Sequence, residues 1–113
     1  MSTPITARVG NSFRMGVKLF NPALGGEDAS ARDLTGAVIA STIRSGPTQG
    51  SDPAPTPEFT IANRMDTAGV FELQLSENHR LAARDYYYEL EVSQNGRNER
   101  VLGGTLQVDA GFV

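Results

Sequence analysis

The chain has 113 residues, of which 39% are hydrophobic and 20% charged, and a length of this order predicts one compact domain with a single core. The net charge is −3 and the Lys and Arg residues are scattered singly, which excludes the basic stripe that a nucleic-acid-binding protein needs. Cysteine is absent and no apolar run approaches the ~20 residues of a membrane span, so disulfides, thiolate metal sites and membrane insertion are also excluded.

Apolar and polar side chains alternate along the chain, and this period predicts an antiparallel all-β fold. A short strand is expected near residues 5–9. In the next strand the inward side chains are Phe13, Met15, Val17 and Leu19. Residues 21–33 have no period and are expected to form a loop. β-branched residues favour a strand over 37–45, whose inward face the pattern leaves open, and 46–57 holds four of the six prolines, which indicates a long exposed loop.

The next segments, 58–64 and 70–75, alternate again and flank a turn at 66–69, so they predict a hairpin. The stretch 76–84 is too short for an independent helix, and we expect a single turn there that crosses between two sheets. The clearest strand covers residues 86–93. Its predicted inward side chains are Tyr86, Tyr88, Leu90 and Val92.

Asn95-Gly96 predicts a tight hairpin turn, because both residues tolerate positive φ. The return strand is expected over 100–108, where Gly103-Gly104 indicates a bulge or the close approach of another backbone. The expected total of about seven strands predicts an all-β fold, an immunoglobulin-like antiparallel β-sandwich. We expect one domain over residues 1–113, with its core between about 8 and 108.

No residue is predicted to be catalytic, to bind a cofactor or to hold a metal. His79 is the single histidine, and its polar neighbours indicate a solvated side chain. Glu89 and Glu91 share a strand face and are interpreted as a solvated outer face, not as a glycosidase pair. Three acidic residues could in principle help to bind calcium: Glu27, Asp28 and Asp33. They do not form a calcium-loop pattern, so they are interpreted as plain loop residues.

Three residues are candidates for binding a partner. Tyr87 should face away from the core, where its ring offers a surface for a sugar or another protein, or else packs across the sheet surface. Phe112 and Val113 are apolar residues that no following strand requires. They are expected to dock on a neighbouring subunit, and packing on their own domain is the alternative.

Several segments carry a family likeness. Residues 81–86 resemble the tyrosine corner of immunoglobulin-like domains, although the Pro-Gly that commonly precedes the tyrosine is missing. Asp33-Leu-Thr-Gly36 and the segments 68–75, 87–92 and 103–108 follow one another as in the small immunoglobulin-like domain of tailed-phage structural proteins. The chain is similar to the N-terminal domain of phage baseplate upper proteins over about residues 8–108.

This resemblance implies a non-enzymatic virion component, made in the host cytoplasm, that acts as an adaptor at the tail, baseplate or fibre attachment site. Its implied partners are other virion structural proteins, in repeated copies within a symmetric assembly. The charge pattern and the lack of a long apolar run indicate that neither nucleic acid nor membrane is a partner. Decoration of the phage capsid is the alternative. A third possibility, from a different class, is a carbohydrate-binding module that contacts surface glycans through Tyr87 and the 46–57 loop.

Overall fold

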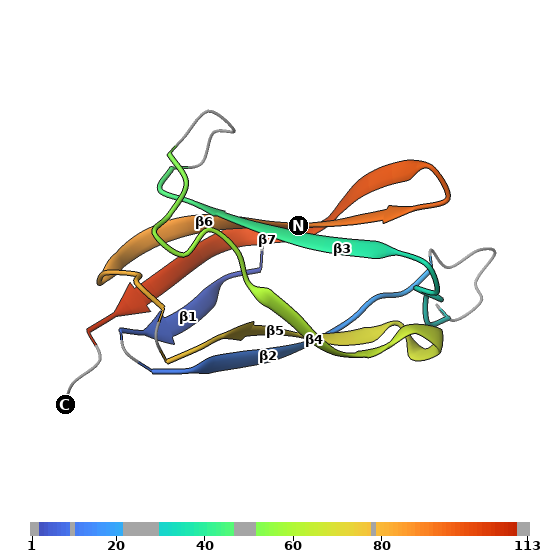
Figure 1. The fold of residues 1–113 in the computed structure, drawn as a ribbon, viewed down its shortest axis with the longest axis horizontal. Coiled ribbons are helices and arrows are strands. Elements are labelled where there is room, and N and C mark those ends of the chain that lie inside the picture. The colour runs from blue at the N-terminus through green and yellow to red at the C-terminus, as the bar shows by residue number, and fades with distance from the viewer. Residues whose placement is uncertain (1–2, 10, 22–29, 47–51, 78, 111–113) are drawn as a thin grey trace.

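The computed structural model describes residues 3–9, 11–21, 30–46, 52–77 and 79–110. They form two packed sheets, one with the strand order β1-β7-β6-β3 and one with the order β2-β5-β4 (Figure 1). The strands are β1 (Ile5–Arg8), β2 (Phe13–Lys18), β3 (Val38–Arg44), β4 (Thr60–Met65), β5 (Val70–Leu75), β6 (Arg84–Gln94) and β7 (Arg97–Asp109), with a short 3-10 turn, η1 (Asp66–Ala68), between β4 and β5. The predicted seven-stranded all-β sandwich is confirmed.

The strand order is that of an immunoglobulin-like sandwich. Strands two, five and four form one sheet, and strands three, six and seven form the other, as do strands B, E, D and C, F, G of that fold. The first strand differs, because β1 lies beside β7 and runs parallel to it from Ile5 opposite Leu106 to Arg8 opposite Asp109. The remaining pairs are antiparallel. The antiparallel prediction therefore fails for this one pair, since alternation alone does not encode pairing direction.

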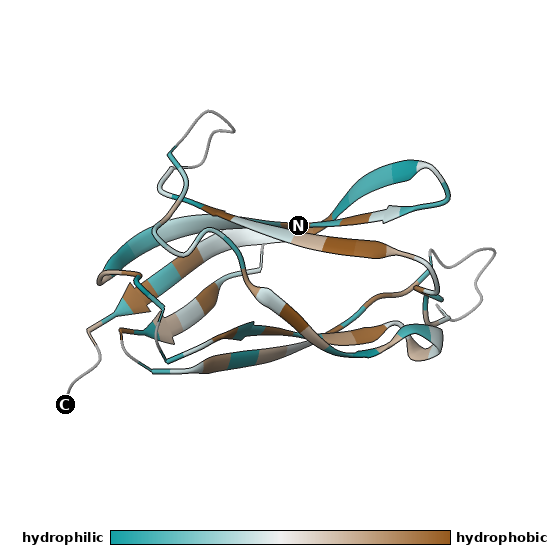
Figure 2. Ribbon diagram, in the orientation of Figure 1, coloured by the Kyte–Doolittle hydropathy of each residue, from teal (hydrophilic) through white to brown (hydrophobic). Residues whose placement is uncertain are grey.

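The core lies between the sheets, where apolar bands of the strands meet (Figure 2). The predicted inward faces of β2 and β6 are confirmed: Val17, Tyr86, Tyr88, Leu90 and Val92 are buried, and Phe13 and Met15 pack against them. On β3, whose inward face the sequence left open, Ser41 and Ile43 are buried while Val38 is exposed. No helix in the described part of the chain is long and apolar enough to cross a membrane.

A buried serine ties β3 to the segment before β4. The Ser41 hydroxyl accepts a hydrogen bond from the Phe59 N–H at 2.5 Å and donates one to the Phe59 carbonyl at 3.2 Å. The Phe59 ring meets Tyr88 edge to face, with 5.8 Å between centroids. Phe59 thus joins the two sheets, and both its N–H and its carbonyl are hydrogen-bonded to Ser41.

The tyrosine corner is present at the start of β6. Tyr86 is buried, and its hydroxyl accepts a hydrogen bond from the Ala82 N–H at 3.1 Å. The preceding segment makes one hydrogen-bonded turn, in which the His79 N–H donates to the Ser76 carbonyl, and then crosses from β5 to β6. Both the corner and the single crossing turn are thus as predicted, without the common Pro-Gly.

The long β6–β7 hairpin has the predicted turn, since Asn95 and Gly96 have φ values of 54° and 78°. The bulge lies at Val101, where Leu90 pairs with Leu102 but Glu91 pairs with Arg100. It is thus two residues before the predicted Gly103-Gly104. The second alternative at that pair, a close backbone approach, is correct for Gly104, because a Cβ there would lie 2.7 Å from the Thr3 carbonyl oxygen.

Candidate interaction surfaces

Tyr87 lies on the outer face of the four-stranded sheet, between the buried Tyr86 and Tyr88. Its cross-strand neighbours are Arg44 on β3 and Thr105 on β7, and its side chain is half-buried between them. The position suits both interpretations of this tyrosine, because an aromatic ring between strands packs on its neighbours and still presents a face to solvent.

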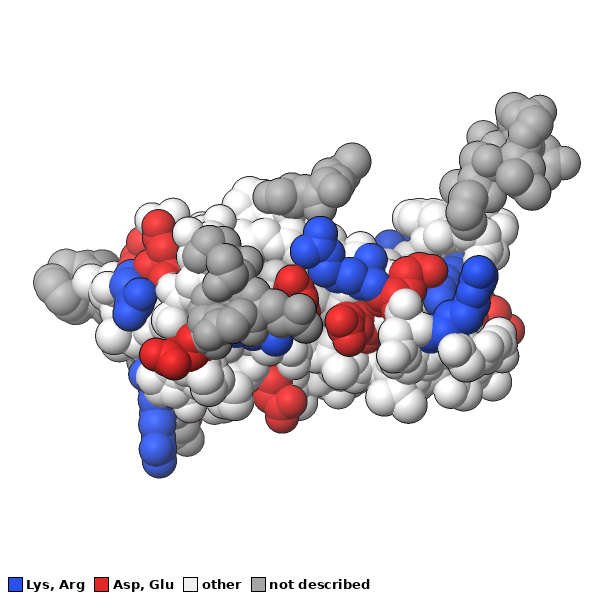
Figure 3. Space-filling view, turned by 90° about the horizontal axis from the view of Figure 1, so that it is seen from above, with Lys and Arg blue, Asp and Glu red and all other residues white. Residues whose placement is uncertain are grey.

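Charged side chains surround this tyrosine. The Glu89 carboxylate lies 3.7 Å from Arg44 and 3.4 Å from Arg100, and Glu91 stands opposite Arg100 on β7. Seen from above, acidic and basic groups are mixed over the visible part of this face instead of gathering by sign (Figure 3). Both glutamates therefore belong to a surface with cross-strand ion pairs, each worth about 0–1 kcal/mol when exposed.

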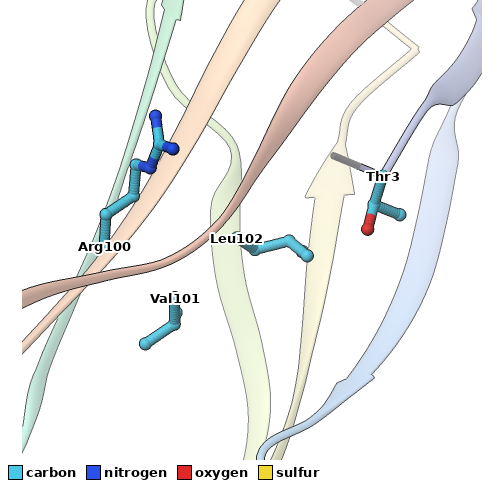
Figure 4. Close-up of a pocket in the computed structure, with 4 residues that line it drawn as sticks. All are labelled: Thr3, Arg100, Val101 and Leu102. Atoms are coloured by element: carbon cyan, nitrogen blue, oxygen red, sulfur yellow. The ribbon is translucent and has the colours of Figure 1, made fainter. Parts of the chain in front are cut away.

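A small hollow opens where β1 stops covering β7. Its lining residues are Thr3, Arg100, Val101 and Leu102, and Leu102 points toward Thr3 (Figure 4). The hollow measures about 170 Å³, which is below the ~300–1,000 Å³ of ordinary ligand pockets. We therefore interpret the hollow as the gap left where the β1–β7 pairing ends, and not as a binding site for a small molecule.

His79 is buried, with 8% of its surface exposed, and the prediction of a solvated side chain is wrong. Its Nε2 lies 2.9 Å from the Arg8 carbonyl oxygen, and its Nδ1 accepts a hydrogen bond from the Leu81 N–H at 3.3 Å. Together these contacts require the tautomer with the proton on Nε2. The crossing segment passes over the end of β1, and the histidine satisfies main-chain groups on both.

Asp33, another candidate ligand, stabilises a turn. Asp33 accepts hydrogen bonds from the Thr35 N–H at 2.9 Å and the Thr35 hydroxyl at 2.6 Å, and these bonds lower the pKa of the Asp33 carboxyl. Within the described ranges, no three His, Asp or Glu side chains gather as metal ligands would. Glu27 and Asp28 lie outside the described residues, as do Phe112 and Val113.

A polar cluster that the sequence analysis missed lies on the outer face of the three-stranded sheet. Glu72 on β5 accepts hydrogen bonds from Gln74 at 2.8 Å, from Asn63 at 2.9 Å and from the Arg14 guanidinium. These hydrogen bonds, with the charge of Arg14, lower the Glu72 pKa to about 2. The signal that could have revealed the cluster is the outward phase of Arg14 and Glu72 on strands that turn out to be neighbours.

Three large apolar side chains are exposed at one end of the sandwich: Phe20 is 53% exposed, Val38 64% and Met65 61%. Main-chain hydrogen bonds place their segments at the same end: the Leu19 N–H donates to the Gly69 carbonyl, just before β5, and the Leu34 N–H donates to the Asp66 carbonyl in η1. Val38 lies on the outer face of the four-stranded sheet, whereas Met65, opposite Val70, lies on the outer face of the three-stranded sheet. We call this region the apolar end. Val38 therefore does not form one continuous patch with Met65, and single exposed apolar side chains are common on protein surfaces.

Compared with known proteins, the chain matches no family model and has no significant match among curated proteins.

Proposed function

We propose that the protein is a non-enzymatic structural component of a tailed-phage virion, an immunoglobulin-like adaptor at the tail, baseplate or fibre attachment site. The sequence likeness over residues 8–108 and the sandwich with its tyrosine corner support this proposal. The observation that carries it is the hydrogen bond from the Ala82 N–H to the buried Tyr86 hydroxyl, the corner expected of that domain. The exposed side chains of Phe20, Val38 and Met65 at the apolar end are available to a protein partner.

The polar side chains that could serve as catalytic groups make structural contacts instead. His79 binds main-chain groups at the crossing segment, and Glu89 makes ion pairs with arginines on both neighbouring strands. In the described residues, every buried side-chain nitrogen or oxygen has a hydrogen-bond partner. These engagements support a binding role over a catalytic one.

Decoration of the phage head uses the same kind of surface and remains the alternative location. A carbohydrate-binding module is the second candidate function, and the half-buried Tyr87 ring on the outer face of β6 favours it. Aromatic rings bind sugars through their flat apolar faces, and the arginines and glutamates around Tyr87 are hydrogen-bonding groups for hydroxyls.

The test is to purify virions, separate heads from tails, and search each fraction for the protein by mass spectrometry. We expect it in the tail fraction; recovery with heads would favour decoration, and absence from particles would reject both locations. Val38→Asp should reduce incorporation, whereas Ala40→Asp, two residues along the exposed face of the same strand, should not. Glycan binding that is lost in Tyr87→Ala, together with absence from virions, would select the carbohydrate-binding module.

A further inference from the structure

Most sheet edges of this sandwich are blunted. The main chain of Ile43 on β3 is paired on its outer side, because its N–H donates to Pro57 and its carbonyl accepts from Ala54. The β4 edge is interrupted by a bulge between Ala62 and Met65. The β1 strand has four residues, and the part of β7 that it leaves uncovered carries the Val101 bulge. Bulges, short strands and covering segments are how proteins prevent strands from adding to a sheet.

The edge of β2 has none of these features. Its residues from Phe13 to Lys18 pair with β5 in an unbroken register. The Leu19 N–H donates to the Gly69 carbonyl, on the β5 side, so the odd-numbered residues of this strand turn their main-chain groups toward β5. The even-numbered residues, Arg14 and Gly16 among them, therefore turn theirs to the open edge. Among the described residues no main-chain group pairs with them there.

We propose that two copies of the protein pair through this edge, with β2 antiparallel to β2 of the second copy about a two-fold axis at Met15. This register sets Met15 opposite its own equivalent and Phe13 opposite Val17 on the inner face. On the outer face it sets Arg14 opposite Gly16, and the main-chain groups of both point to the edge, so they form hydrogen-bonded pairs. Two three-stranded sheets become one continuous six-stranded sheet.

Charge selects this register over its neighbours. An axis at Arg14 would set Arg14 against its own equivalent, and an axis at Gly16 would set Arg14 against Lys18. Like charges directly opposite each other destabilise a sheet, so both of these registers are disfavoured. The axis at Met15 leaves each arginine facing a glycine.

The outer face of Gly16 has room for the arginine that this register places opposite it. A Cβ at Gly16 would have no atom within 4 Å, so the Arg14 side chain of the second copy has room to lie over it. The residue opposite Gly16 on β5 is Glu72, the carboxylate that Arg14 of the same chain already binds. Each Glu72 therefore faces two arginines across the joined sheet, which is the charge complementarity that a second copy supplies.

The dimer should be weak in solution. Pairing of one six-residue strand covers Phe13 and Met15, which are half-buried in the single chain, but buries less than the ~1,200 Å² of a stable interface. Repetition in a symmetric assembly raises the effective concentration and makes such a contact sufficient. The role of this dimer in a virion rests on the proposed function, whereas the pairing of the two strands rests on the strand geometry alone.

Sedimentation velocity over concentrations from about 10 µM to about 1 mM, the range in which weak interfaces dissociate, measures the pairing. We expect reversible dimers, and protection from hydrogen exchange that rises with concentration at the amides of Arg14, Gly16 and Lys18. Gly16→Lys should weaken the dimer at least tenfold, because the new charge faces Arg14 of the second copy. Within its own chain the lysine stands opposite Glu72, so the fold is not weakened.

Thr60→Lys is the matched control, because it adds the same charge to the outer face of the same sheet on β4, away from the open edge. It should dimerise as the wild type does. A protein that stays monomeric at about 1 mM, or a Gly16→Lys variant that still dimerises, would overturn the inference. A monomer that is nevertheless found in virions refutes this inference alone, and a dimer absent from virions refutes the proposed function alone.

Discussion

Gly69, between η1 and β5, is a position where one added methyl group should be costly. Its φ is +67°, and a Cβ would lie 2.6 Å from the Arg32 carbonyl oxygen and 2.8 Å from that of Leu19. A left-handed alanine costs about 1–2 kcal/mol by itself. Here the main chain must also move, which loosens the hydrogen bonds from Arg32 N–H to Leu19 and from Leu19 N–H to Gly69, each worth about 1 kcal/mol. Gly69→Ala should therefore lower the free energy of unfolding by about 3–4 kcal/mol.

The control is Gly36→Ala, because Gly36 has a similar φ of +77° and open space around its Cβ position. This variant should lose only the conformational cost of about 1–2 kcal/mol. Urea unfolding followed by far-ultraviolet circular dichroism measures both variants against the wild type. Equal losses in the two would refute the reasoning, since they would show that the close contacts with Arg32 and Leu19 add nothing.

Three further perturbations test single contacts. Tyr86→Phe removes the acceptor of the Ala82 N–H and should cost about 1 kcal/mol in urea unfolding with an unchanged circular dichroism spectrum. His79→Ala leaves the Arg8 carbonyl without its donor and should cost about 1–3 kcal/mol; no loss would indicate a solvated ring. The Glu72 pKa of about 2 lies below the usual 4.5, so its stabilising effect is complete above pH 4.5 and is lost as the pH falls toward 2. Glu72→Gln should flatten the dependence of the unfolding midpoint on pH in that range, and a chemical-shift titration of Glu72 checks the pKa directly.

Local patterns predicted much of this fold. Alternation identified the inward side chains of β2 and β6, and Asn95-Gly96 identified the hairpin turn, because a strand must bury one face and this turn needs two positive φ values. Tyr86 was a candidate for the corner from its place at the start of the strand, and its hydroxyl makes the corner hydrogen bond. In each case the decisive interaction lies within a few residues of the signal.

Long-range contacts account for the failures. His79 has polar neighbours in the sequence, yet it is buried because the crossing segment passes over Arg8, 71 residues away. The Glu72 cluster joins Arg14 and Asn63, which lie on two different strands. Neither arrangement follows from periodicity, because both depend on which strands become neighbours.

The sheet that the first strand joins also depends on long-range contacts, and it decides whether the edge of β2 is open. In constant-type immunoglobulin domains the first strand lies beside the second, where it would cover the edge of β2. Here Thr3 is held on the other sheet: its N–H donates to Gly103 at 2.8 Å, and its carbonyl accepts from the buried Tyr88 hydroxyl. Gly104 permits this, because any side chain there would meet the Thr3 main chain. A glycine and a tyrosine on β7 and β6 thus draw β1 away from β2, and the edge that could pair with a second copy stays open as a consequence.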